Sequence, residues 1–377
     1  MRGEVAGKAV KVLVAMSGGV DSSVAAALLL RQGHEVAGAT MKLWGGPSDT
    51  GCCSVADVED ARRVCQQLGI DHHVFNFTSE FERDVVAPYV AAHQRALTPN
   101  PCVACNAHLK FDRFLERALA VGFDAIATGH HARVVHLGNG WRLLRGRDPA
   151  KDQSYVLYML GQEQLCRLRL PIGDLTKAEV RALAGELGLR TANKPDSQDV
   201  CFISKAAGRE SFLKQRMALH PGRLVSSAGE QLGQVGALEM VTVGQRRKLG
   251  LSPAAPAERL YVTQVDLSEG TATVGGLAEL MVRSVRLHDV SWSLAPPEAG
   301  EAVWVQVSAH GQPLSARWLG PQVGSPEEAG PAGATSREAG GTVEFDLPVR
   351  RVAPGQAVVL YQTYPEGDAV VGGGTAA

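Results

Sequence analysis

The 377-residue sequence lacks any hydrophobic run near the length of a membrane span, although 45% of its residues are apolar. It also lacks the anatomy of a signal peptide, because the first apolar run is short and leads directly into a glycine turn. Neither sign of charge dominates, and a formal net charge of −1 neither requires nor excludes a nucleic-acid partner. We therefore expect a cytoplasmic, globular protein of two or three domains.

Cysteine is scarce, and its seven copies do not predict a disulfide framework, because the number is odd and no export signal is present. Cys102 and Cys105 form a Cys-x-x-Cys pair in "NPCVACN". No second pair of this kind completes four zinc ligands at the usual spacing. Cys105 is predicted to stand at the start of a helix, where the dipole would favour a reactive thiolate. The apolar face of that helix is predicted to contain Leu109, Phe111, Leu115, Ala118 and Leu119. Cys201 falls in a polar loop, "KPDSQDVCFIS".

Short apolar strands alternate with amphipathic helices over the first two hundred residues. Two of these helices begin with capping patterns, at Ser54 to Asp57 and in "TKAEVRALAGELGL". This alternation predicts an α/β fold with a doubly wound, mostly parallel sheet. The pattern then changes to one helix with short strands, including strands around "MVTVGQRRKLG", and from about residue 278 it is typical of a small antiparallel β-barrel. We predict a catalytic domain at 1–206, a small mixed central domain at 207–277 and a C-terminal barrel at 278–377. Residues 321–341 are poor in apolar side chains and predict a mobile insertion loop.

The stretch "AMSGGVDSS", Ala15 to Ser23, lies between the first predicted strand and a helix. It is neither a Walker A motif nor a Gly-x-Gly-x-x-Gly turn. Its glycines allow a tight turn, and its serine hydroxyls and helix-start amides suit an anion. The stretch resembles the pyrophosphatase loop of ATP-pyrophosphatases, which cleave ATP between its α and β phosphates and adenylate a substrate oxygen. The resemblance implies ATP as substrate and Mg²⁺ as its companion, with Asp21 placed to help hold the metal. The ATP-binding residues that it implies are Ala15, Met16, Ser17, Gly18, Gly19, Val20, Asp21, Ser22, Met41 and Gly129, with Ser23 also in the loop.

Seven segments together resemble one family, the tRNA-specific 2-thiouridylases, and they span nearly all of the chain. They are "AMSGGVDSSVAA", "TPNPCVACNAHLKF", "ATGHHARV", "KDQSYVLYML", "KPDSQDVCFI", "TVGQRRKLGL" and "VAPGQAVVLY" with the later "VGGG". The resemblance implies ATP-dependent 2-thiolation of the wobble uridine of tRNA, giving 2-thiouridine, AMP and pyrophosphate. It implies that Cys201 carries sulfur as a persulfide, received from a carrier protein or a cysteine desulfurase relay, and that Cys105 is the second catalytic thiol.

The same resemblance implies the contacts with tRNA. The target base would face Asn100, Pro101 and Cys102 after leaving its stack. Contacts elsewhere on the tRNA are implied for His130, Lys151, Asp152, Gln153 and Gln356, and the C-terminal barrel would hold the anticodon stem-loop mainly through its backbone. Cys102 departs from the pattern, because well-known members have an aspartate there.

Three alternatives remain open at this point. Cys102, Cys105 and Cys201 would together ligate a [4Fe–4S] cluster whose open iron holds the sulfide, with substrate and product unchanged. A synthetase that shares the loop would need a glutaminase domain, and the chain has no obvious signature of one. A non-catalytic nucleotide-binding protein would bind ATP without releasing pyrophosphate.

Overall fold

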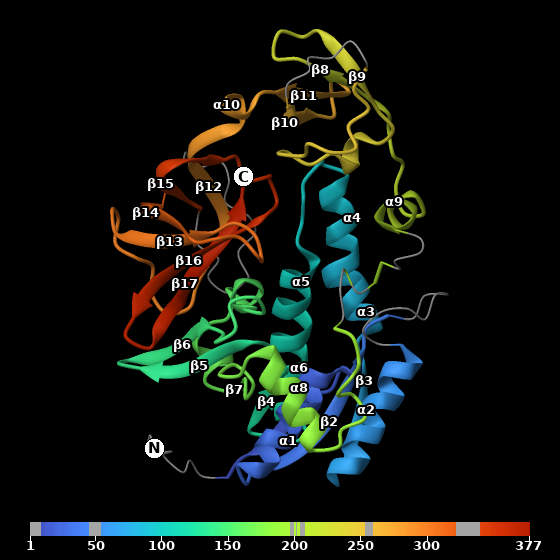
Figure 1. Cartoon of the computed structure of the whole chain (residues 1–377), viewed down its shortest axis with the longest axis vertical. Helices are drawn as coiled ribbons and strands as arrows, with labels where there is room; N and C mark the ends of the chain where they lie inside the picture. The colour runs from blue at the N-terminus through green and yellow to red at the C-terminus, as the bar shows by residue number, and fades with distance from the viewer. Residues whose placement is uncertain are drawn as a thin grey trace. The chain divides into compact units, whose positions relative to one another are not determined.

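The structure is a computed structural model that describes residues 9–44, 54–196, 200, 202–203, 208–252, 259–321 and 340–377. The chain forms two compact units (Figure 1). The first contains Met1–Val85 and Cys102–Lys205, and the second contains Val86–Pro101 and Ala206–Ala377. Among the described helices, none has both the length and the apolar character that crossing a membrane requires.

A parallel five-stranded sheet forms the centre of the first unit and confirms the predicted fold class. Its strands, in spatial order, are β3 (His72–Asn76), β2 (Glu35–Lys42), β1 (Lys11–Ala15), β4 (Ala125–Ala127) and β7 (Leu168–Arg169). The chain runs outward from β1 in both directions, so the strand order reverses between β1 and β4. Ligands of open parallel sheets bind at such a point, beyond the carboxyl ends of the strands.

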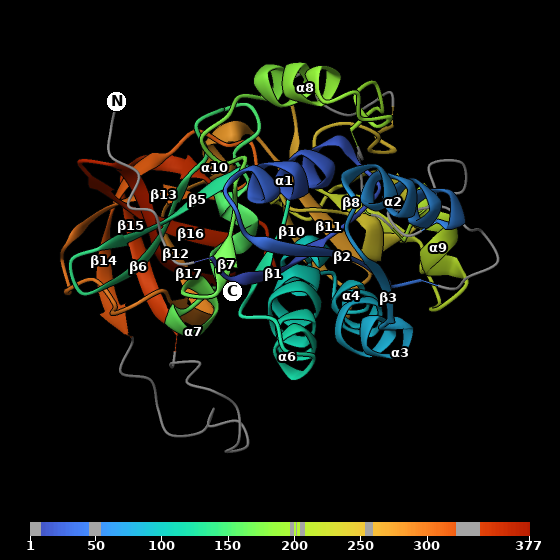
Figure 2. The same ribbon diagram turned by 90° about the horizontal axis from the view of Figure 1, so that it is seen from below.

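Helices cover both faces of this sheet, as Figure 2 shows. One face carries α1 (Val20–Arg31), α2 (Val55–Leu68) and α8 (Lys177–Glu186), and the other carries α6 (Phe114–Ala120). Two helix starts match their sequence signals. The hydroxyl of Ser54 accepts the amide of Asp57 at 3.1 Å, and Thr176 and Glu179 form a reciprocal capping box. Completely buried Val12, Val14 and Val24 belong to the core beneath the helices.

The remaining elements of the first unit are shorter. They are α3 (Thr78–Phe81), η1 (Glu82–Val86, which runs into the second unit), α5 (Pro101–Ala104, which begins there), η2 (Cys105–Arg113), the hairpin of β5 (Ala132–Leu137) and β6 (Gly140–Arg145), η3 (Ser154–Leu157) and α7 (Gln162–Leu165). Helical geometry is continuous from Pro101 to Ala120, because α5, η2 and α6 follow one another without a break. The middle part, η2, is a π-helix, which is wider than an α-helix and is frequent at functional sites.

The second unit contains two sheets. A smaller one has the order β10 (Tyr261–Asp266), β11 (Thr271–Gly275), β8 (Gly222–Val225) and β9 (Gln231–Val235). Short helices accompany it: α4 (Ala87–His93), α9 (Gly208–Lys214), η4 (Leu238–Met240) and α10 (Leu277–Leu280). Strands were also predicted around "MVTVGQRRKLG", which was wrong: the segment holds the end of η4 and turns, and an isolated bridge at Leu251 follows it.

Antiparallel strands of the second unit close into the predicted C-terminal β-barrel. The order is β12 (Met281–Trp292), β15 (Gly341–Arg350), β14 (Leu314–Pro321), β13 (Ala302–Gln306), β16 (Ala357–Tyr364) and β17 (Gly367–Ala376), and β17 pairs with β12 to close the ring. Trp318, Phe345 and Leu360 are among its buried core residues. The predicted insertion loop falls between β14 and β15, and its residues 322–339 lie outside the described part of the chain.

Candidate active site at the carboxyl edge of the parallel sheet

The serine–glycine loop joins β1 to α1 at the point where the strand order reverses. Gly18 has a φ of +69°, and a Cβ there would lie 2.3 Å from the carbonyl oxygen of Asp57, so only glycine fits. The carbonyl of Gly19 accepts the hydroxyls of Ser22 at 3.2 Å and Ser23 at 2.8 Å. These bonds fold the loop back onto the first turn of α1. The amides of that turn have no intrahelical partners, as at any helix start, and an anion site requires such amides.

Met41 and Gly129, which the sequence places at the ends of two other strands, lie at the same edge. Met41 is the penultimate residue of β2 and is 8% exposed. Gly129 follows β4 and touches the loop, because a Cβ there would lie 2.6 Å from the amide nitrogen of Ser22. The structure therefore brings Gly129 against the loop from a segment more than a hundred residues away. That all of these residues bind ATP stays a prediction.

Asp21 is the charged side chain of the loop, and a lysine from α8 neutralises it. Lys177 donates to both carboxylate oxygens, at 2.8 and 2.7 Å, and His131 Nε2 lies 3.4 Å from one of them. Burial works to raise the pKa of Asp21, but the hydrogen bonds from His131 and Lys177 outweigh it and hold that pKa below its usual value. His131 Nδ1 is buried without a hydrogen-bond partner among the described residues, which favours the tautomer with the proton on Nε2.

A second carboxylate, Asp196, shares the amine of Lys177 at 2.9 Å. It also binds Lys151 at 2.8 Å and Arg181 at 2.7 Å. Burial works to raise the pKa of Asp196, but hydrogen bonds from Lys151 and Lys177 lower it strongly. Sequence reasoning missed Lys177 and Asp196. The available signal was a lysine at the first position of a capped helix, where the macrodipole disfavours a cation unless carboxylates compensate for it.

The carboxylate of Asp21 has the chemistry that Mg²⁺ requires, since this ion prefers carboxylate and phosphate oxygens. Its side chain is 30% exposed, so an ion from solution can reach it. Both of its oxygens accept hydrogen bonds from Lys177, however, so an ion bound there would be repelled by that ammonium until the amine moves. The residues fit the metal on that condition.

Cys102 and Cys105 lie on consecutive turns of one helical run, with different surroundings. Cys102 is exposed and Cys105 is 7% exposed. The prediction that Cys105 stands at the helix start was wrong, because the run begins at Pro101. Proline suits a first helical position, and the amides without intrahelical partners are those of the first turn, which contains Cys102. The dipole argument therefore applies to Cys102, and the catalytic role of Cys105 stays a prediction on other grounds.

His130 is buried beside the π-helical segment that Cys105 opens. Its ring lies 5.7 Å from that of Phe111, and its Nδ1 is 2.7 Å from the hydroxyl of Thr128. Burial, followed by the nearby Lys110 and His131, holds the pKa of His130 well below its usual value. A neutral, buried ring is suited to positioning the helix and less suited to a direct phosphate contact.

Cys201 lies outside the described residues, but both flanks of its segment are anchored in the first unit. Before it, Lys194 binds Asp57 at 2.7 Å and Asp60 at 2.8 Å. Directly after it, Phe202 is 4% exposed, and its ring lies 6.3 Å from Trp44 and 5.6 Å from Phe81. The described residues on either side of Cys201 are thus tied to α2 and to an aromatic cluster.

In the "KDQ" segment, the charged side chain of Lys151 is exposed to solvent, whereas the side chains of Asp152 and Gln153 form hydrogen bonds within the protein. Lys151 is 40% exposed while paired with Asp196. Asp152 is 7% exposed, and its oxygens accept from Arg145 and from the amide of Gly146. Gln153 accepts the amide of His131 at 2.9 Å. Of the three, Lys151 is the one whose charge faces solvent.

Gln356 and Asn100 belong to the second unit. The amide of Gln356 donates to the carbonyl of Thr98 at 2.7 Å, and the amide of Thr98 donates to Pro354 at 2.8 Å. These bonds hold the chain two residues before Asn100, at the start of the predicted target-base segment. Gln356 therefore orders that segment, whatever else it contacts.

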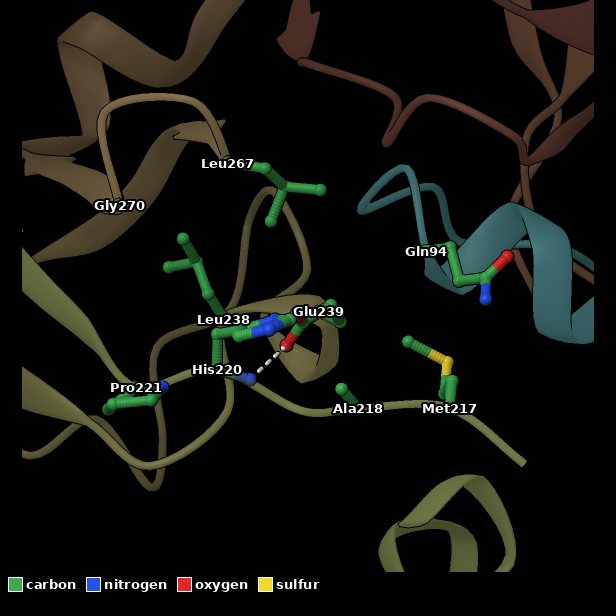
Figure 3. A pocket seen from close by; sticks show the side chains of 9 residues that line it. All are labelled: Gln94, Met217, Ala218, His220, Pro221, Leu238, Glu239, Leu267 and Gly270. Atoms are coloured by element: carbon green, nitrogen blue, oxygen red, sulfur yellow. Dashed lines mark hydrogen bonds and ion pairs between the residues drawn. The ribbon is translucent and has the colours of Figure 1, made fainter. Parts of the chain in front are cut away.

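A cavity of about 410 Å³ lies elsewhere in the second unit (Figure 3). Its walls include Met217, Leu238 and Leu267, and the carboxylate of Glu239 accepts the amide and Nδ1 of His220 at 3.0 and 2.6 Å. None of the residues predicted to bind ATP or tRNA lines it.

Comparison with known proteins identifies the family. The family model "tRNA methyl transferase HUP domain" matches residues 10–205, and "Aminomethyltransferase beta-barrel domain" matches residues 325–376. Relatives named tRNA-specific 2-thiouridylase MnmA are 42% identical in Roseiflexus sp. (strain RS-1), over 97% of this chain and 98% of the relative, and 43% identical in Chloroflexus aurantiacus, over 96% and 97%. A solved U34-tRNA thiolase from Methanococcus maripaludis matches 51% of this chain and 61% of its own at 18% identity, with a TM-score of only 0.33. The near-complete match to the curated relatives shows that this chain belongs to the tRNA-specific 2-thiouridylase family of enzymes.

Proposed function

We infer that the protein catalyses ATP-dependent 2-thiolation of the wobble uridine of tRNA. The observation that carries this inference is the convergence of the serine–glycine loop, Asp21 and Gly129 at the carboxyl edge of the sheet, where the strand order reverses. The names of the full-length relatives support tRNA as the substrate. In this proposal the loop binds the phosphates of ATP, Asp21 holds Mg²⁺ beside them, and Met41 and Gly129 border the adenosine. Mg²⁺ there would supply neutralising charge for the departing pyrophosphate.

Adenylation turns a poor leaving group into a good one. The C2 oxygen of the uridine attacks the α-phosphorus of ATP, and the bond from that phosphorus to the bridging oxygen breaks. Pyrophosphate leaves, and the amides at the start of α1 with the hydroxyls of Ser17 and Ser22 stabilise its charge. The base reaches the α-phosphate only after leaving its stack, and Asn100, Pro101 and Cys102 are proposed to receive it.

Sulfur transfer then requires two thiols. The terminal sulfur of a persulfide on Cys201, supplied by a carrier protein or a cysteine desulfurase relay, attacks C2, and AMP leaves. Cys105 attacks the inner sulfur of Cys201, so the sulfur–sulfur bond to the transferred atom breaks and a Cys105–Cys201 disulfide forms. A thiol reductant restores both residues. Burial of Cys105 supports this role, because a shielded site protects the persulfide and the adenylate from water.

Contacts with the rest of the tRNA are proposed for Lys151, through its exposed charge, and for the C-terminal barrel. His130, Asp152, Gln153 and Gln356 are proposed to act by holding the neighbouring backbone, since their polar atoms bond within the protein. The iron–sulfur alternative would use Cys102, Cys105 and Cys201. No described contact favours it, since Cys201 lies outside the described residues.

Two variants test the two half-reactions. Asp21→Asn should abolish pyrophosphate release while tRNA binding persists, and undiminished pyrophosphate release would contradict the assignment. Cys201→Ser should still release pyrophosphate with tRNA and ATP but make no 2-thiouridine. A single-turnover assay on metal-stripped protein, given a persulfide donor without oxygen, distinguishes the sulfur carriers. Product without iron supports the persulfide, and product only after iron and sulfide are restored supports the cluster.

A further inference from the structure

The amine of Lys177 lies where a metal ion would bind Asp21, beside the loop that would bind a nucleotide. Its amine contacts both oxygens of Asp21, at 2.8 and 2.7 Å, and one oxygen of Asp196 at 2.9 Å. A lysine amine has three N–H donors, so these contacts use all of them. Each oxygen of Asp21 keeps a second lone-pair site, but Mg²⁺ bound there at about 2.1 Å would lie close to the ammonium charge, and the repulsion between the two cations favours departure of the amine.

The rest of Lys177 is fixed, so its side chain alone is free to reorient. Its backbone amide donates to Asp148 at 2.9 Å, and the preceding Thr176 forms the capping box of α8. When the amine leaves Asp21, Asp196 remains as a partner. Asp196 is also bound by Lys151 and Arg181, so its charge is already compensated and Lys177 becomes the surplus cation.

The local charge count points to what the surplus cation would meet. Three cations (Lys151, Lys177 and Arg181) pair with two carboxylates (Asp21 and Asp196), and the carboxylate of Asp148 lies beside them, so the local charge is close to balance before any ion binds. A divalent ion at Asp21 adds two positive charges. A polyphosphate bound at the adjacent start of α1 is the ligand that balances this charge.

We propose that Lys177 is an exchanging cation: it fills the metal position at Asp21 in the free protein, and binding of metal and ATP transfers its amine to the phosphate chain. The proposal rests on the proposed function, because it takes the serine–glycine loop as the ATP site. It adds a substrate-contacting residue that lies outside the loop and outside the segments with family motifs.

The test uses one substitution with two opposite expected effects on the full-length protein. Lys177→Met removes the competitor at Asp21, so Mn²⁺ binding to the nucleotide-free protein, followed by electron paramagnetic resonance, should become roughly tenfold tighter. The same variant lacks the phosphate contact, so binding of α,β-methylene-ATP, measured by calorimetry with saturating Mg²⁺, should weaken roughly tenfold or more. Structural damage would weaken both. Lys177→Gln, which keeps a hydrogen-bond donor without charge, replaces the methionine variant if that one does not fold.

Lys11→Met is the matched control, because it removes the positive charge paired with Glu35 at the amino end of β1, away from Asp21, and it should leave Mn²⁺ affinity unchanged. Equal Mn²⁺ affinity in wild type and the Lys177 variants, with binding lost in Asp21→Asn, would overturn the exchange while keeping the metal site. Mn²⁺ binding that Asp21→Asn does not alter would overturn the metal site itself, and with it part of the proposed function.

Discussion

Gly129→Ala tests whether the contact between β4 and the loop sets the reaction geometry. A Cβ at this position would lie 2.6 Å from the amide nitrogen of Ser22 and 2.7 Å from the carbonyl carbon of Asp21. Both atoms are backbone, so no side chain can turn away. Ser22 would have to retreat from 2.6 Å to at least 3.4 Å, where ordinary contact begins, which is a shift of about 0.8 Å. Overpacking of this kind costs roughly 1–3 kcal/mol of stability.

The kinetic effect should exceed the effect on folding. A misplacement of about 1 Å at a reacting centre can cost about a hundredfold in rate, so we expect pyrophosphate release in a single turnover to slow roughly ten- to a hundredfold. Thermal unfolding of the variant measures the loss of folding stability separately. Gly185→Ala is the matched control, since a Cβ there meets nothing within 4 Å and the residue lies inside α8. It should leave the rate unchanged and raise stability by up to about 1 kcal/mol. A Gly129→Ala enzyme with wild-type rate would refute the reasoning.

Three further outcomes follow from particular contacts. Asp152→Ala should lower the free energy of unfolding by about 3 kcal/mol, because it leaves the guanidinium of Arg145 without its carboxylate; a loss of tRNA affinity at unchanged stability would show instead that Asp152 contacts tRNA. At pH 8, iodoacetamide should modify exposed Cys102 well before Cys65, whose thiol pKa burial raises to about 11, as peptide mapping would show; equal rates would contradict the burial of Cys65. Burial works to raise the pKa of Glu239, but hydrogen bonds from His220 lower it below 4.5, so this pair stabilises the protein above that pH and the stability is lost as pH falls through the folded-state pKa. Denaturant unfolding of Glu239→Gln should therefore depend less on pH between about 5 and 3 than that of wild type, and parallel curves would contradict this.

Local signals in the sequence were sufficient for most of the first unit. The loop, the capped starts of α2 and α8 and the apolar strands all follow from residues close together in the chain, and the structure agrees with them. The interior of the helical run around Cys105 was less predictable. Leu119 was expected on the apolar face of that helix, yet it is 37% exposed, while Phe114 is completely buried. Leu115 and Ala118, which follow the π-helical stretch, are buried as expected, so the prediction failed at single positions and not along the whole face.

Strand β17 shows a second limit of pattern reading. Its centre is "VVGGG", and glycine normally weakens a strand, so propensity gives no reason to extend a strand through it. The partner strand β12 explains why glycine stands at these positions. A Cβ at Gly372 would lie 2.3 Å from the carbonyl oxygen of Ser291, and one at Gly374 would lie 2.9 Å from the carbonyl oxygen of His288. The barrel closes there, where β12 and β17 approach too closely for side chains. That requirement comes from a contact between residues about eighty positions apart.

The charged residues around the loop show why the sequence predicted only part of the candidate site. Ser17, Gly18, Gly19 and Asp21 are consecutive or nearly so, and their spacing is itself a signal. Lys177 binds the carboxylate of Asp21 from far along the chain and lies outside the family segments. Asp196 shares its amine and lies in "KPDSQDVCFI", where nothing in the sequence singles out its charge. Each carries a charge that would be unfavourable where it stands without the other. Compensation of this kind depends on three-dimensional proximity, so a sequence can suggest it only through an anomaly, such as a lysine at the positive end of a helix. That anomaly is where a search for the remaining ATP-handling residues should begin.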